Sequence, residues 1–193
     1  MEGRQPESPG RGWIADAERL DRAIYGAIAR TETPSIDRGM RRLARAADRS
    51  ALNVLNAALI AACGGSAGRR AAKVGLASVA VTSAVVNAGI KPVARRRRPD
   101  RELHTVPVAR HVPMPTSRSL PSGHAAAAFA FATGAGQVMP RAAVPLRLFA
   151  VAVAYSRVHT GVHYPGDVVA GALAGTVIAQ ATAHAFDRSL RAR

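Results

Sequence analysis

Two residues suited to covalent chemistry lie four positions apart in the C-terminal part of the chain. His163 and Asp167 are separated by Tyr-Pro-Gly, and Arg157 comes six positions before His163. A carboxylate that accepts a hydrogen bond from one imidazole nitrogen fixes the tautomer and leaves the other nitrogen free to attack. This segment therefore supplies a candidate nucleophile, a group that orients it and a cation.

Two other motifs are suited to anion binding. Lys91 and Arg98 stand seven positions apart where a long uncharged run ends, so both can point toward one negative group. Ser122, Gly123 and His124 open another uncharged run. Ser122 can cap the helix there, while the free amides beside it face an oxyanion. Both motifs therefore predict a phosphate site.

The elements that must position these motifs are uncharged segments of nearly membrane-spanning length. They cover residues 51–68, 74–90, 125–140, 148–156 and 168–183. The longest are close to the minimum of about 17 residues for a span. Gly171 and Gly175 would let two helix backbones approach closely, as in membrane bundles. A soluble alanine-rich bundle is the alternative, in keeping with a mean hydropathy of +0.03, but the number and length of the runs favour the membrane.

If these segments cross the membrane one after another, their order predicts that the three motifs lie on the same side. The run that ends near Lys91 arrives at one side of the membrane, the run after His124 leaves that side, and the run before Arg157 returns to it. All three motifs then lie on the same side. The proline-rich segment 99–121 is expected to be a loop that covers or edges the site.

The chain is predicted to have four parts and an all-α fold. Residues 1–11 are expected to be a disordered leader, and residues 12–49 an amphipathic helical segment that lies at a membrane interface or packs on a neighbour. Residues 50–187 hold the motifs and the membrane-embedded helices, and residues 188–193 form a basic tail. Strand-like alternation is absent from the sequence, so we expect a multi-span membrane bundle of about five to six core helices after an N-terminal amphipathic helix.

The motifs together resemble the signature of the type-2 phosphatidic acid phosphatase family. That signature is Lys-x6-Arg-Pro, then Pro-Ser-Gly-His, then Ser-Arg-x5-His-x3-Asp, and every specified position is matched between residues 91 and 167. Three multi-residue motifs in this order, each at a predicted helix boundary, are far more specific than any one of them. The resemblance implies a membrane lipid phosphatase, with residues 50–187 as its phosphatase domain.

The resemblance also implies a role for each site residue. His163 would attack phosphorus and form a phosphohistidine, while Asp167 would hold its other ring nitrogen. His124 would protonate the departing alkoxide and later activate water. The phosphoryl oxygens would be neutralised or bound by Lys91, Arg98, Ser122, Gly123 and Arg157.

Neither a metal nor another cofactor is expected. The acidic side chains between the first and last motif residues are Asp100, Glu102 and Asp167, fewer carboxylates than a two-metal site normally uses. His159 and His163 stand four apart, as in some zinc sites. A glycine between them disfavours the helix that such a site requires, and no glutamate accompanies them.

The composition leaves two other classes of protein open. The formal charge is +15, carried almost wholly by arginine, and it suits phosphate groups, nucleic acid or an anionic membrane. The arginine run at 95–98 is a candidate nucleic-acid patch, but it lacks aromatic stacking residues and lies between apolar runs, so no nucleic-acid partner is expected. A vanadium haloperoxidase is disfavoured by the short chain and the apolar helices. Cys63 is the sole cysteine and permits no internal disulfide or thiolate metal cluster.

The predicted partners are a lipid phosphate substrate and the membrane. The lipid stays open among polyprenyl phosphates or diphosphates, a polyprenyl-phosphate-linked sugar phosphate, phosphatidylglycerophosphate and phosphatidic acid. A composition rich in arginine and alanine is typical of a GC-rich genome. It favours the polyprenyl lipids of bacterial cell-wall synthesis and a multi-pass protein of the plasma membrane. Arginines occur on both predicted sides, so the orientation of the site stays open.

Overall fold

The computed structural model describes residues 9–191, and over this range the chain is helical with no strand. In chain order the elements are α1 (Pro9–Arg30), α2 (Pro34–Ala46), η1 (Asp48–Ser50), α3 (Ala51–Cys63), α4 (Gly65–Ala84), η2 (Val85–Ile90), α5 (Lys91–Val93), η3 (Val108–Arg110), α6 (Gly123–Val138), α7 (Pro140–His159) and α8 (Pro165–Arg191). The predicted all-α class is confirmed. The predicted leader and tail lie outside the described residues except at 9–11 and 188–191, which belong to α1 and α8.

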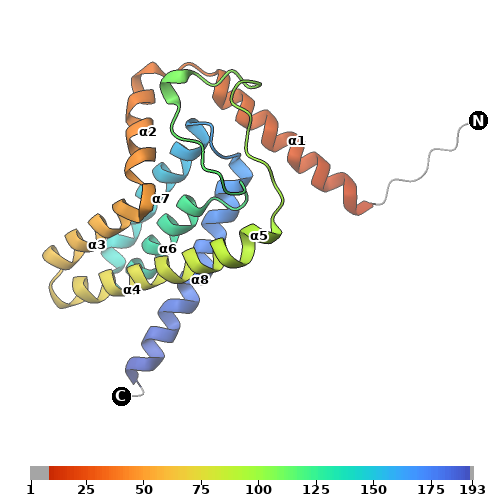
Figure 1. Cartoon of the computed structure of the whole chain (residues 1–193). Coiled ribbons are helices and arrows are strands. Elements are labelled where there is room, and N and C mark those ends of the chain that lie inside the picture. The colour runs from red at the N-terminus through yellow and green to blue at the C-terminus, as the bar shows by residue number, and fades with distance from the viewer. Residues whose placement is uncertain (1–8, 192–193) are drawn as a thin grey trace, which may run out of the picture.

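Helix α6 is the core of the bundle. It lies in the middle of the molecule, in contact with α4, α7 and α8 (Figure 1). Eleven of its sixteen residues are buried, and these are mostly alanine and glycine. Small side chains let three neighbours approach one helix from different directions, as in membrane bundles. Its N-terminus, which begins at Gly123, is therefore held in a fixed position at one end of the bundle.

The contact between α6 and α8 depends on the two glycines of the predicted small-residue pair. A Cβ on Gly171 would lie 2.4 Å from the carbonyl oxygen of Ser122, and a Cβ on Gly175 would lie 2.1 Å from that of Ala126. The backbones therefore touch, as the spacing predicted. The same contact brings the start of α8 against the start of α6, where the Ser122 amide donates to the Asp167 carbonyl at 2.9 Å.

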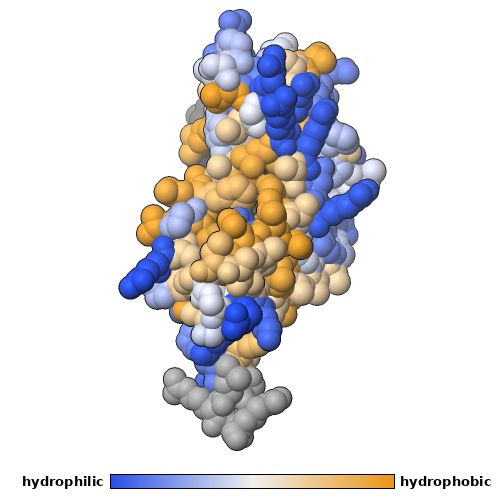
Figure 2. Space-filling model, turned by 90° about the vertical axis from the view of Figure 1, so that its left-hand side faces the viewer, coloured by the Kyte–Doolittle hydropathy of each residue, from blue (hydrophilic) through white to orange (hydrophobic). Residues whose placement is uncertain are grey.

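Two helices are long and apolar enough to cross a bilayer. They are the continuous helical segment Gly65–Val93 and the segment Pro165–Arg188, of 29 and 24 residues. Only 33% and 22% of their apolar windows are buried inside the protein, whereas the core helix of a soluble protein would be mostly covered. Figure 2 shows an apolar band across the face that carries α3, with hydrophilic residues gathered above and below it. Exposed Val54, Leu55 and Leu59 of α3 belong to the apolar surface. These observations favour the membrane bundle over the soluble one.

The uncharged residues 51–68 do not form the single near-spanning segment that their length suggested. Helix α3 ends at Cys63, the chain turns at Gly64, and α4 begins at Gly65. Gly65 has a positive φ of 58°, and a Cβ on Gly64 would lie 2.7 Å from the backbone of Gly68, so both positions require glycine. With 13 residues, α3 is about 20 Å long, shorter than the roughly 30 Å apolar core of a bilayer.

Helix α1 and the loop after α5 cover one end of the bundle (Figure 1). The C-terminal half of α1 packs on the protein: Tyr25 is buried, and its hydroxyl donates to the Gly161 carbonyl at 3.3 Å. The N-terminal half leaves Trp13 and Leu20 exposed, which suits a membrane interface. The proline-rich segment runs as the predicted loop, anchored by Arg110 of η3, whose guanidinium donates to the Ile28 carbonyl at 3.0 Å.

The closeness of α6 and α8 gives a prediction about stability. Gly175→Ala places a methyl group where the Ala126 carbonyl lies, so the helices must separate, and we expect a loss of about 1–3 kcal/mol. Gly39→Ala is the matched control: Gly39 is also helical, nothing lies within 4 Å of its added Cβ, and the change should stabilise α2 slightly. Melting temperatures in detergent test this, and equal shifts in both variants would contradict the close contact.

Candidate active site

The carboxylate of Asp167 gathers hydrogen bonds from four sides. His163 Nδ1 lies 3.4 Å from Asp167 Oδ2, the Tyr164 amide donates to the same oxygen at 2.9 Å, and the Ser119 hydroxyl also donates to it. Arg96 donates to Oδ1 at 3.0 Å. The side chain of Asp167 is fully buried, so its charge is compatible with burial only because these donors satisfy it.

The imidazole of His163 is held on both nitrogens. Nδ1 faces Asp167, and Nε2 lies 3.1 Å from Nη1 of Arg98. The network assigns the proton to Nδ1, so that Nε2 keeps its lone pair and accepts from the guanidinium. His163 is 1% exposed and follows the turn that ends α7, where Gly161 has a φ of 72°. The Asp167 carboxylate on Nδ1 and the lone pair left on Nε2 are compatible with the nucleophile and orienting roles that the sequence analysis expects for this pair.

Burial lowers the pKa of His163 to about 4. The hydrogen bond to Asp167 opposes this shift, and the nearby charges of Arg98 and Arg157 add to it. The imidazole is therefore neutral at physiological pH, as a nucleophile must be.

The loop after α5 brings the first motif onto the same site. Arg98 donates from Nε to the Ser117 carbonyl at 2.8 Å and from Nη1 to the Val162 carbonyl at 2.9 Å. Lys91 Nζ donates to the Ser117 hydroxyl at 3.4 Å. A Cβ on Gly123 would lie 3.4 Å from the same Nζ, so Lys91 lies over the N-terminus of α6. The cations and the free amides of α6 therefore face one point, as an oxyanion site requires.

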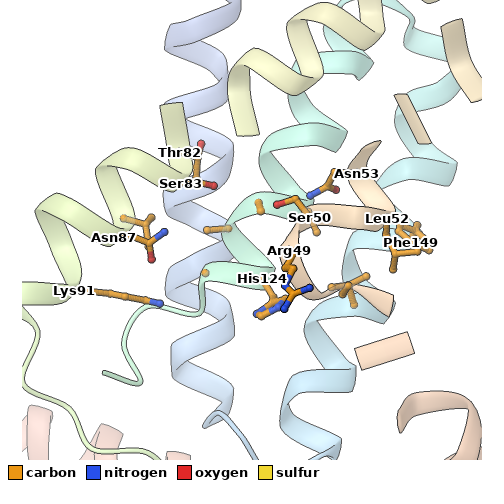
Figure 3. A pocket seen from close by; sticks show the side chains of 17 residues that line it. Arg49, Ser50, Leu52, Asn53, Thr82, Ser83, Asn87, Lys91, His124 and Phe149 are labelled. Atoms are coloured by element: carbon orange, nitrogen blue, oxygen red, sulfur yellow. The ribbon is translucent and has the colours of Figure 1, made fainter. Parts of the chain in front are cut away.

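Ser122 and His124 occupy the start of α6 as predicted. The Ser122 hydroxyl accepts from the Ala125 amide at 3.4 Å and caps the helix. His124 lines a cavity of about 190 Å³ together with Lys91 and Gly123 (Figure 3). Figure 3 shows Lys91 reaching across from the α4 side of this cavity toward the α6 end that carries His124.

Arg157 is buried with part of its hydrogen-bonding capacity unused. It is 1% exposed, and Nη1 donates to the Ala44 carbonyl at 2.9 Å. Among the described residues its Nε has no partner. A buried guanidinium with a free donor favours an anionic ligand, because a bound oxyanion would supply the missing acceptor.

Three residues of the site were not identified from the sequence. Asp48, in the turn η1, bonds His124 Nε2 at 3.0 Å and lies 3.8 Å from Arg157. Arg96 joins Asp167 to Asp21 of α1, and the carboxylate of Asp21 also accepts from the Gly166 amide at 2.7 Å. Arg96 belongs to a visible arginine run, but no local pattern selects it or indicates the two aspartates.

All predicted site residues thus lie at one end of the bundle, on α5, α6, α7 and α8, in the loop between α5 and α6, and in the turn after α7. The residues are His163, His124, Asp167, Lys91, Arg98, Ser122, Gly123 and Arg157. Within the described range, no three His, Cys, Asp or Glu side chains come together as metal ligands. His159 instead bonds Asp37 at 2.9 Å and stays apart from His163.

The fold and the site define a helical bundle with a histidine-centred anion site at one end. The family model of the PAP2 superfamily matches residues 72–191, so the chain belongs to the PAP2 superfamily. This range contains every predicted site residue, whereas Asp21 and Asp48 lie outside it.

Solved structures share the fold. Aquifex aeolicus LpxE has a TM-score of 0.66 at 24% identity, covering 84% of this chain and 94% of that one. A transmembrane PAP2-type phosphatidylglycerolphosphate phosphatase from Bacillus subtilis has a TM-score of 0.67 at 22% identity, covering 90% and 87%. At these identities the likeness concerns the fold alone.

Curated relatives share part of the sequence. The decaprenylphosphoryl-5-phosphoribose phosphatases of two Mycobacterium tuberculosis strains, CDC 1551 / Oshkosh and ATCC 25618 / H37Rv, are each 38% identical over 91 residues. The match spans 46% of this chain and 47% of the relatives, about half the length of each.

The network around Arg96 predicts a positioning role for this residue. Arg96→Gln would leave the Asp167 carboxylate without its cation and loosen the orientation of His163. We expect the kcat of phosphate-ester hydrolysis to fall about 10- to 100-fold with little change in KM. Arg97→Gln, at an exposed neighbour, is the control. If both variants behaved alike, Arg96 would have no such role.

The low pKa of His163 predicts acid-sensitive stability. Its ordinary pKa is 6.5 and the folded-state pKa is about 4, so between these values the unfolded chain binds more protons. Stability from this group is therefore present above pH 6.5 and is lost as pH falls toward 4. We expect the melting temperature to fall more steeply over this range in the wild type than in His163→Gln, equivalent to about 3 kcal/mol at most. Identical pH dependence in the two proteins would contradict the lowered pKa.

Proposed function

We propose that the protein is an integral-membrane phosphoric ester hydrolase that removes phosphate from a lipid through a phosphohistidine on His163, without a metal. The observation that carries this proposal is the arrangement of His163, buried and neutral, with Asp167 on one ring nitrogen and Arg98 on the other. Membership of the PAP2 superfamily and the phosphatase names of its relatives support it.

The first half of the reaction transfers the phosphoryl group to the protein. Nε2 of His163 attacks phosphorus, a P–N bond forms and the P–O bond to the leaving group breaks. Arg98, which donates to Nε2 in the substrate-free structure, exchanges that bond for one to a phosphoryl oxygen. Lys91 and the free Nε of Arg157 are placed to neutralise further phosphoryl charge. Burial lowers the pKa of His124 to about 4, and the negative charge of a bound phosphate together with Asp48 opposes that shift. The His124 imidazolium formed with substrate bound gives its proton to the departing alkoxide.

The second half returns the protein to its starting state. His124 takes a proton from water, the resulting hydroxide attacks the phosphohistidine, and the P–N bond breaks to release inorganic phosphate. Asp48 bonds His124 Nε2 and so orients the ring for both steps. The Asp167 bond to Nδ1 keeps His163 in the tautomer whose Nε2 is free again.

An apolar groove beside the catalytic turn supports a lipid substrate. It has a volume of about 280 Å³ and is lined almost entirely by apolar surface from α1, α6, α7 and α8. Pro165 and Val168, which lie on either side of Asp167 in sequence, are among its lining residues. A surface of this kind suits contact with the acyl or prenyl chains of a bilayer, from which a lipid substrate would come. The exposed apolar faces of α4 and α8 support a multi-pass protein, for which we propose the bacterial plasma membrane.

Two observations bear on the alternative of nucleic-acid binding and on the choice of lipid substrate. Arg96 and Arg98 of the arginine run point inward to Asp167 and His163, which leaves half of the run unavailable for nucleic acid. The relatives named for a decaprenylphosphoryl sugar phosphate support a polyprenyl-linked substrate. Both a polyprenyl-linked and a glycerophospholipid substrate suit the site chemistry.

The decisive test is phosphate release from a lipid panel with EDTA present. Wild-type protein in detergent should release phosphate, and His163→Ala should lower the rate by about 10³-fold or more, because no other group replaces the nucleophile. Brief incubation with substrate labelled on the phosphoryl group should leave acid-labile label on wild type alone. His184→Ala, at an exposed histidine of α8, is the control. Loss of activity in EDTA, or label retained in His163→Ala, would overturn the mechanism.

A further inference from the structure

A group of polar side chains lines the part of the cavity beyond Lys91 and His124. Thr82 and Ser83 of α4 and Asn87 of η2 come from one wall, and Asn53 of α3 comes from the opposite wall (Figure 3). These residues lie in stretches of α3, α4 and η2 that carry no charged side chain. Polar groups at such positions in membrane helices face cavities and are usually functional.

The hydroxyl of Thr82 is buried without a partner. Thr82 is 0% exposed, and its Oγ1 makes no hydrogen bond in the described part of the chain. Other helical hydroxyls bond the carbonyl one turn back: Ser78 bonds Val74 at 2.8 Å, and Thr182 bonds Ile178 at 2.8 Å. Thr82 leaves that bond unmade and keeps its donor for the cavity.

Asn53 also lines the cavity without a partner among the described residues, but its amide, unlike the Thr82 hydroxyl, is not fully buried. Asn53 is 7% exposed, lines the cavity, and has no hydrogen-bond partner among residues 9–191. Asn87 connects this polar group to the phosphate site, because its Oδ1 lies 4.0 Å from where a Cβ on Gly123 would be. Thr82 precedes Lys91 by nine helical residues, so the polar wall is about 13 Å long. That length accommodates a group attached to the phosphate.

The cavity lies on the leaving-group side of the site. Displacement at phosphorus places the attacking and leaving atoms roughly in line, with the general acid beside the leaving oxygen. His124, the general acid of the proposed mechanism, lines the cavity, whereas His163 does not. The cavity therefore holds the group that departs, and its polar wall contacts that group.

We infer that the leaving group carries free hydroxyls, as in a lipid-linked sugar or polyol phosphate, and that these hydroxyls bond to Thr82, Asn53, Ser83 and Asn87. This inference rests on the proposed function and specifies its substrate class. The basic groups lining the cavity are Lys91, Arg49 and His124, and none of the described lining residues is acidic, so an anionic or neutral headgroup fits better than a cationic one. A lipid without hydroxyls would leave the polar wall desolvated and unpaired.

The test compares phosphate release from two pairs of lipids by the full chain in detergent. One pair has free hydroxyls on the leaving group: a polyprenyl-phosphate-linked sugar phosphate and phosphatidylglycerophosphate. The other pair has none: polyprenyl phosphate and phosphatidic acid. We expect wild type to favour at least one hydroxyl-bearing lipid by about 10-fold or more in kcat/KM. Thr82→Val, which keeps the shape but removes the hydroxyl, should reduce that preference about 10-fold.

Two further variants test whether the Thr82 hydroxyl itself causes the preference. Thr82→Ser retains a hydroxyl and should restore the preference, and Ser78→Ala, one turn away, removes a hydroxyl that bonds its own helix and should leave the preference unchanged. The preference is a ratio within one preparation, so it does not depend on how much of a variant is folded.

The outcomes separate the two claims. If wild type releases phosphate from none of the four lipids, the proposed function fails and the inference falls with it. If wild type hydrolyses the lipids without preference, or if Thr82→Val keeps the wild-type preference, the hydroxyl-binding wall alone is refuted.

Discussion

The structure around the site depends on one buried carboxylate. Asp167 has no solvent to stabilise its charge, so the fold must bring every donor to it. Those donors come from the turn after α7 and from the loop after α5, and Asp21 of α1 accepts a hydrogen bond from Arg96 and so holds that donor in place. The backbone carbonyl of Asp167 also accepts from Ser122 and fixes the start of α6. Satisfying this charge therefore brings His163, the cations and the N-terminal amides of α6, the groups that the proposed mechanism uses, to one place.

Close packing of small residues makes that assembly possible in a short chain. The glycines of α8 lie against the backbone of α6, so the N-termini of these two helices stand side by side. Free amides, a capping hydroxyl and the carboxylate then converge without long connecting loops. The outward faces of α4 and α8 are apolar and are not covered by the protein itself. Contact of these faces with a bilayer would keep them out of water.

In the proposed mechanism, substrate selection is separated from the chemistry along the axis of the bundle. The basic residues of the cavity sit at the helix ends, where the proposal places the phosphate, and uncharged polar residues lie between α3 and α4. Thr82 and Asn53 have no role in orienting His163 or Asp167, yet they keep unpaired polar groups in an apolar region. Such groups persist at a cost in stability when a ligand uses them. The two regions can therefore vary independently among proteins with the same catalytic end.

The sequence by itself determined the helical class, the order of the motifs and the glycine pair, because each is a matter of spacing along one helix or at one helix end. Only the tertiary structure selected Asp21, Asp48 and Thr82. The bond from Arg96 to Asp21 joins residues 75 apart, and that from His124 to Asp48 joins residues 76 apart. Nothing local distinguishes such an aspartate from one in solvent, or a free threonine hydroxyl from one bonded to its own helix. Their roles arise from which helices pack together and which buried charges then need partners.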